Sequence, residues 1–94
     1  MNRRFPAGVA TGQMVTDIFE YAKENNFALP AVNVIGSSNA NAVMETAAKL
    51  NSPVIIQFSN GGAAYNAGKG LSNDGQKAAI AGAVAGAKHI HTLA

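Results

Sequence analysis

Residues 53–62, Pro-Val-Ile-Ile-Gln-Phe-Ser-Asn-Gly-Gly, decide the fold because they join an apolar strand to a glycine-rich segment. The β-branched and aromatic residues at 54–58 are typical of a strand that is covered on both faces. Successive side chains of a strand point to opposite faces, so Ile55, Gln57 and Ser59 share one face. Two polar side chains are therefore expected together at the carboxyl end of the strand, where α/β proteins bind ligands. The alternative is that Gln57 only satisfies a neighbouring backbone group.

A second strand is predicted upstream at residues 28–35, Ala-Leu-Pro-Ala-Val-Asn-Val-Ile. Asn33 lies near its carboxyl end and repeats the polar pattern of Gln57 and Ser59. Between the two strands, Ser38 is the expected cap of a helix that runs to about Leu50. The expected buried stripe of that helix is Ala40, Val43, Met44, Ala47 and Leu50.

Further helices are predicted on both sides of this unit. Thr11 is the expected cap of a first helix that ends at Asn25 and Asn26, because Asn tolerates the left-handed conformation. The last helix is expected to follow directly after Asn73, which resembles a capping box with Gln76. Its many Ala and Gly residues predict close packing against a neighbouring element.

Residues 60–73 are predicted to form a long glycine-rich loop, and loops of that length are often functional. They do not form a nucleotide-binding P-loop, because Ala63 and Gly70 replace the first glycine and the magnesium-binding hydroxyl of that motif. Two interpretations stay open, a loop whose backbone N–H groups bind an anion and an ordinary flexible loop.

The composition excludes several classes of protein. The chain has 94 residues, 48 % of them hydrophobic, and a net charge of +2 that is too small and scattered to indicate nucleic-acid binding. The absence of cysteine excludes disulfides and cysteine-based zinc sites. The longest apolar segment, residues 78–87, is too short to span a membrane, and no secretory signal is visible, so the cytoplasm is the expected location.

The histidines do not predict a metal site. His89 and His91 are the only two in the sequence, and a spacing of two on a helix points their rings in different directions. A structural or surface role is expected for both.

The predicted order of helix, strand, helix, strand and helix gives a parallel βαβ unit in the α/β class. Two parallel strands cannot close a core, because both are edge strands and parallel sheets are normally covered on both faces. We therefore expect this unit to be the opening quarter of a larger domain.

Several sequence blocks resemble one family. Residues 22–33, Ala-Lys-Glu-Asn-Asn-Phe-Ala-Leu-Pro-Ala-Val-Asn, and residues 57–63, Gln-Phe-Ser-Asn-Gly-Gly-Ala, are followed by Ala-Gly-Lys-Gly at 67–70. Together they resemble the amino-terminal part of class II fructose-bisphosphate aldolases, and the resemblance extends from about Gly8 to Ala94.

The resemblance implies a single (β/α)8 barrel domain, of which residues 1–94 are the amino-terminal fragment. It implies a cytoplasmic, zinc-dependent lyase of glycolysis and gluconeogenesis that acts as a homodimer. Such an enzyme cleaves a phosphorylated sugar, fructose 1,6-bisphosphate, to dihydroxyacetone phosphate and glyceraldehyde 3-phosphate. In the family, the metal polarises the ketone and an aspartate transfers the proton.

The resemblance also assigns roles to individual residues. Ser59 matches a serine that binds substrate, and Gln57 and Asn33 match polar residues that line the same site. Gly61 and Gly62 would let the glycine-rich loop pass close to the substrate.

The His-x-Asp-His motif that supplies the family's catalytic aspartate and first zinc ligand does not occur in this sequence. We therefore expect the chain to be a truncated piece that contains no catalytic residue and no metal ligand, and that alone neither binds zinc nor cleaves substrate. Two alternatives remain, a fragment of tagatose-bisphosphate aldolase and a non-catalytic βαβ module that binds phosphate or assembles with other chains.

Overall fold

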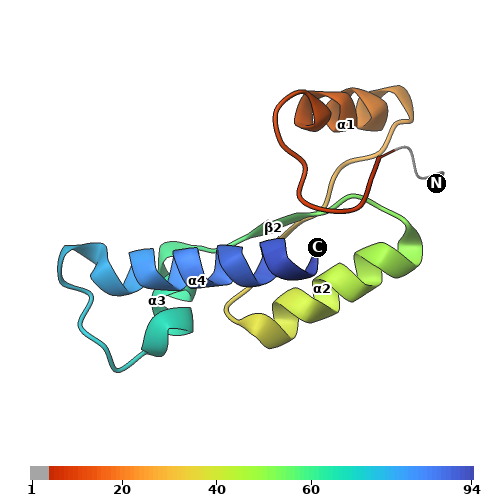
Figure 1. The fold of residues 1–94 in the computed structure, drawn as a ribbon. Coiled ribbons are helices and arrows are strands. Elements are labelled where there is room, and N and C mark those ends of the chain that lie inside the picture. Colours follow the sequence, from red (N-terminus) through yellow and green to blue (C-terminus); the bar gives the residue numbers. More distant parts are fainter. Residues whose placement is uncertain (1–4) are drawn as a thin grey trace.

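The computed structural model describes residues 5–94 as two short parallel strands with helices around them. The molecule is elongated, with extents of 45 × 23 × 20 Å, and Figure 1 shows α3 beside α4 at one end and α1 at the other. The elements in chain order are α1 (Gln13–Glu24), β1 (Ala31–Asn33), α2 (Ser37–Leu50), β2 (Ile55–Gln57), α3 (Asn60–Gly68), the 3₁₀ turn η1 (Asp74–Gln76) and α4 (Lys77–Leu93).

The two strands pair in parallel and α2 connects them, which confirms the predicted βαβ order. Both strands are shorter than predicted, because regular pairing covers only three residues of each. The Cα partners are Ala31 and Ile55, Val32 and Ile56, and Asn33 and Gln57.

Glycines on α4 allow the closest helix packing in the molecule. A Cβ atom on Gly82 would overlap the carbonyl group of Ala63 on α3, and a Cβ on Gly86 would overlap the ring of Phe58. The side-chain amide of Asn66 on α3 donates to the carbonyl oxygen of Gly82 over 2.9 Å. The close packing predicted for the last helix is confirmed.

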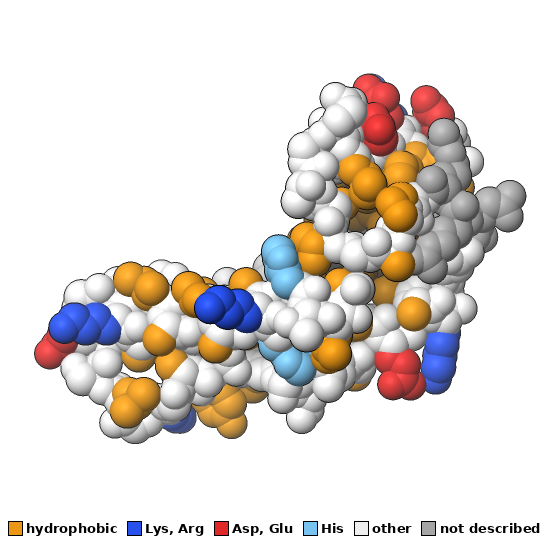
Figure 2. Space-filling model, in the orientation of Figure 1, with side chains coloured by type: hydrophobic (Ala, Val, Ile, Leu, Met, Phe, Trp, Pro, Cys, Tyr) orange, Lys and Arg blue, Asp and Glu red, His pale blue; other side chains and the backbone are white. Residues whose placement is uncertain are grey.

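The buried side of α4 is made of small residues, whereas Ile80 and Val84 are 59 % and 49 % exposed. Figure 2 accordingly shows hydrophobic side chains on the surface over α4 and beside α1. The predicted stripe on α2 is wrong at Leu50, which is 66 % exposed at the last residue of the helix. Exposed apolar side chains on this scale are typical of a surface that another part of a protein covers.

The predicted caps of α1 and α2 are wrong by one or two residues. Gly12 precedes α1 with a φ of 58°, a conformation that glycine adopts without strain, and the hydroxyl of Thr11 does not cap the helix. At α2, the side-chain oxygen of Asn39 accepts the backbone N–H groups of Ile35 and Gly36 over 3.2 and 3.1 Å, so the helix begins before Ser38.

The predicted loop at 60–73 is also wrong, because most of it forms the helix α3. The true loop is confined to residues 69–73. Asn73 and Gln76 do interact, with 3.4 Å between the amide nitrogen and oxygen, but Asn73 precedes η1, Gln76 is its last residue, and α4 begins only at Lys77. Asn73 also accepts the backbone N–H of Ala79 over 3.0 Å and so caps the first turn of α4.

Candidate functional site

Two amide side chains lie side by side at the carboxyl ends of the strands. Asn33 and Gln57 are register partners and the last residues of β1 and β2. Adjacent strands lie about 4.8 Å apart, so the two side chains start from neighbouring positions on one face. Both are exposed, and within residues 5–94 neither side chain forms a hydrogen bond. Their donors and acceptors are therefore available to a ligand.

The strand face that carries these amides is open, which corrects the prediction of strands covered on both faces. Ile55 shares this face with Gln57 and is 39 % exposed. The opposite face holds Ile56 and Phe58, which are half-buried, and Phe58 packs against α4. The helices therefore cover one face of the sheet only, and the uncovered face is the one with the polar residues.

Ser59 continues this polar face beyond β2. It lies two residues after Gln57 in an extended conformation, is exposed, and forms the N-cap of α3. Its hydroxyl oxygen accepts the backbone N–H of Gly62 over 3.0 Å, which leaves the hydroxyl hydrogen free to be donated. The amino-terminal end of α3 adds a partial positive charge at the same place.

The two glycines after Ser59 belong to the first turn of α3 rather than to a loop. A Cβ on Gly62 would lie 3.2 Å from the Ser59 hydroxyl oxygen and from the backbone oxygen of Val34, so glycine lets the helix start against the end of β1. Gly61 is exposed, and a Cβ there would have no neighbour within 4 Å. Of the two, Gly62 has a packing role, and Gly61 lies on the open side.

The structure does not assemble a metal site from the residues it describes. In residues 5–94, no three His, Cys, Asp or Glu side chains lie close enough together to hold an ion. His89 lies 2.7 Å from the side-chain oxygen of Asn41 and links α4 to α2, whereas His91 is exposed. In the same part of the chain, no helix is both long and apolar enough to cross a membrane.

Because Asn33 and Gln57 are exposed, we expect Asn33→Ala and Gln57→Ala to change the free energy of unfolding by less than about 0.5 kcal/mol. Val34→Ala is the control, because Val34 is fully buried beside Asn33 and its truncation is expected to cost about 2 kcal/mol. Urea unfolding of the three variants measures both effects. A large loss in the amide variants would mean that they are structural residues.

The comparisons with known proteins agree with one another. The family model for class-II fructose-bisphosphate aldolase matches residues 13–94. The class 2 fructose-bisphosphate aldolase of Escherichia coli is 60 % identical over 88 residues, and the fructose-bisphosphate aldolase of Saccharomyces cerevisiae is 55 % identical over 87 residues. Each alignment covers 93 % of this chain and 24 % of the relative.

A crystal structure of the fructose-bisphosphate aldolase from Campylobacter jejuni has the same arrangement of elements. It superposes with a TM-score of 0.85 at 55 % sequence identity, over 94 % of this chain and 24 % of that one. The chain therefore spans about a quarter of the length of the relatives it matches.

Proposed function

This chain belongs to the class-II fructose-bisphosphate aldolase family, and we propose that it forms the first quarter of a (β/α)8 barrel that cleaves fructose 1,6-bisphosphate. The products would be dihydroxyacetone phosphate and glyceraldehyde 3-phosphate. The 24 % coverage of the relatives supports this proposal, as does the sheet that is covered by helices on one face only. In a barrel, the uncovered face of these strands would point to the interior.

The observation that carries the proposal is the alignment of three polar residues on that face. Asn33 and Gln57 pair in register, and Ser59 follows two residues later. Active sites of such barrels lie at the carboxyl ends of the strands, and these are the residues at those ends. Two amides and a hydroxyl offer hydrogen bonds to a sugar phosphate without adding negative charge, and the start of α3 favours an anion.

Gly61 and Gly62 support the site indirectly in this proposal. Gly62 lets α3 begin against β1, which fixes the position of Ser59. Gly61 leaves the side next to the hydroxyl unobstructed, since no atom lies within 4 Å of the place where its Cβ would be.

Zinc would be held by parts of the enzyme other than the residues described here. The two histidines of the chain lie on α4, and the ring of His89 is engaged with the side chain of Asn41. We assign to this segment the binding and orientation of substrate, and to the remaining barrel the metal and the proton transfer.

The family also favours a cytoplasmic homodimer of glycolysis as the complete enzyme. The relatives reported above carry the name fructose-bisphosphate aldolase, which favours fructose over tagatose as the sugar. A non-catalytic module is the other candidate, because a two-stranded sheet with open edges also suits assembly with other chains.

A chimera tests the proposal. Residues 1–94 of this chain replace the matching quarter of the Campylobacter jejuni aldolase, which is 55 % identical over this region. We expect the chimera to cleave fructose 1,6-bisphosphate in the presence of zinc, to lose this activity with a chelator, and to act poorly on tagatose 1,6-bisphosphate. A folded chimera without activity would favour the non-catalytic module.

A further inference from the structure

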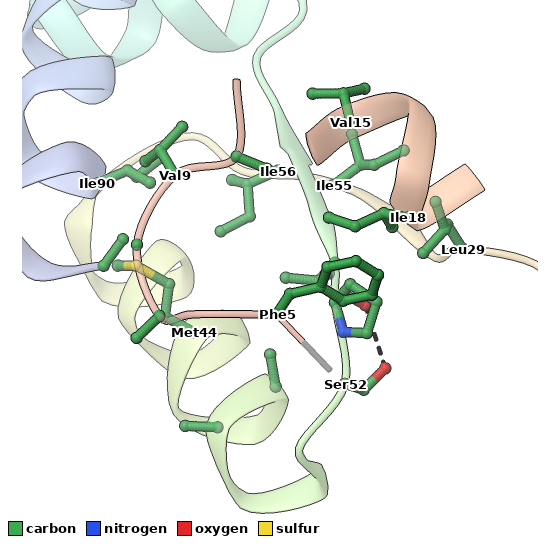
Figure 3. A pocket seen from close by; sticks show the side chains of 18 of the residues that line it. Phe5, Val9, Val15, Ile18, Leu29, Met44, Ser52, Ile55, Ile56 and Ile90 are labelled. Atoms are coloured by element: carbon green, nitrogen blue, oxygen red, sulfur yellow. Dashed lines mark hydrogen bonds between the residues drawn. The ribbon is translucent and has the colours of Figure 1, made fainter. Parts of the chain in front are cut away.

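Small residues form the contact between α3 and the amino-terminal half of α4. The buried residues of the two helices are all glycine or alanine, at positions 62 and 63 on α3 and at 78, 79, 82 and 86 on α4. Larger side chains gather at the other end of α4, where Figure 3 shows Ile90, Met44 and Ile56 around an apolar cavity of about 680 Å³. Of the described residues, none between 59 and 86 lines this cavity. Because interdigitating side chains normally fix how two helices pack, the position of α3 on α4 needs another determinant.

Asn66 supplies a directional contact at this interface. Its side-chain nitrogen donates to the carbonyl oxygen of Gly82 over 2.9 Å, and the residue is half-buried. Within residues 5–94, this is the one side-chain hydrogen bond that joins α3 to α4. A hydrogen bond weakens steeply when its length or angle changes, so this one opposes sliding of α3 along α4.

The other side of the Asn66 amide faces the turn that follows β1. A Cβ on Gly36, in that turn, would lie 3.9 Å from the side-chain oxygen of Asn66. Four residues earlier, on the same face of α3, a Cβ on Gly62 would lie 3.2 Å from the backbone oxygen of Val34. Asn66 therefore lies between α4 and the segment that directly follows Asn33.

We propose that Asn66 is a positioning residue for substrate binding, because it fixes α3 on α4 and so places the hydroxyl of Ser59 beside the amides of Asn33 and Gln57. Ser59 is the N-cap of α3 and moves with the helix. Asn66 lies seven residues further along, about 10 Å by helical rise, and acts through Ser59 rather than on the substrate. The inference rests on the substrate site proposed above and adds a residue that controls this site from outside it.

The test compares Asn66→Leu with Asn41→Leu in the zinc-loaded chimera. Leucine has the same branching and number of side-chain heavy atoms as asparagine but cannot donate a hydrogen bond. Asn41 is the matched control, because it also joins a neighbouring helix to α4, through its 2.7 Å contact with His89. We expect Asn66→Leu to raise the KM for fructose 1,6-bisphosphate about five- to tenfold and to leave kcat within about twofold, since a phosphate is equally charged in the bound substrate and the transition state. Asn41→Leu should leave both constants unchanged.

The split between KM and kcat separates positioning from a purely structural role. A variant that only loses stability contains less folded enzyme, which lowers the apparent kcat but not KM. Adding Asn66→Leu to Ser59→Ala should change KM by less than about twofold, because Asn66 acts through Ser59. An unchanged KM in Asn66→Leu, or an equal rise of KM in the Ser59→Ala background, would overturn the inference. Asn66→Ala is the second variant if Asn66→Leu does not fold.

Hydrogen exchange keeps this inference and the proposed function apart. If the chimera folds but is inactive, the substrate assignment is wrong, and deuterium uptake by residues 60–68 still decides whether Asn66 fixes α3. Faster uptake in Asn66→Leu than in Asn41→Leu would support that role, and equal uptake would overturn it. If the chimera is active and Asn66→Leu keeps the parental KM, the aldolase assignment stands and the positioning role is wrong.

Discussion

Replacing Gly82 with alanine is expected to lower the free energy of unfolding by about 3 kcal/mol. The added Cβ would overlap the carbonyl of Ala63, which is main chain and cannot rotate away. Helix α3 would have to move off α4, and the 2.9 Å hydrogen bond from Asn66 to Gly82 would be strained or lost. Urea unfolding of the chimera with and without this substitution, followed by circular dichroism, measures the effect.

Gly61→Ala is the control for this result. Gly61 also lies in a helix, but a Cβ there would meet no atom within 4 Å, so a change below about 0.5 kcal/mol is expected. Gly86→Ala should fall between the two, because the obstacle is the ring of Phe58, which is a side chain and can move. Equal stability of Gly82→Ala and Gly61→Ala would contradict the packing of α3 on α4.

Replacing Ser59 is expected to have the largest effect on catalysis in the chimera. Ser59→Ala would remove the proposed hydrogen bond to a charged substrate, and a loss of about 1.5–3 kcal/mol corresponds to roughly a 10- to 150-fold lower kcat/KM. It also removes the cap that accepts from Gly62, which is expected to cost about 1 kcal/mol of stability. Steady-state kinetics and urea unfolding measure the two effects.

Ser59→Asp separates these two roles. Aspartate caps a helix as well as serine, so the stability of this variant should match that of the unmodified protein. Its negative charge would repel a phosphorylated sugar, so kcat/KM should fall further than in Ser59→Ala. If Ser59→Asp is as active as the unmodified chimera, Ser59 is only a helix cap and does not contact substrate.

The sequence correctly predicted the parallel βαβ unit and the positions of Asn33 and Gln57 near the carboxyl ends of its strands, because strand periodicity and parallel pairing depend on local pattern. The sequence prediction failed at residues 60–68, because Asn60, Gly61 and Gly62 at the start of this segment are typical of a loop although the segment forms a helix. Ser59 is a favoured N-cap residue and was the signal that could have identified this helix.

Burial was less predictable than secondary structure. Ile55 and Leu50 are apolar and fall at strand and helix spacing, which predicts that they are buried. Both are exposed in the structure. Whether such a side chain is covered depends on elements that pack from elsewhere, which local pattern does not contain. The cap by Asn39 was missed for a different reason, since its oxygen reaches backward along the chain to Ile35 and Gly36.

The most direct test of the central claim, that the open strand face forms part of an aldolase active site, is the kcat/KM of the zinc-loaded chimera for fructose 1,6-bisphosphate. We predict a value within about tenfold of the Campylobacter jejuni parent, a difference of about 1.4 kcal/mol or less in transition-state stabilisation. A chimera that folds and binds zinc like the parent, but whose kcat/KM is lower by roughly a thousandfold or more, about 4 kcal/mol, would contradict the claim.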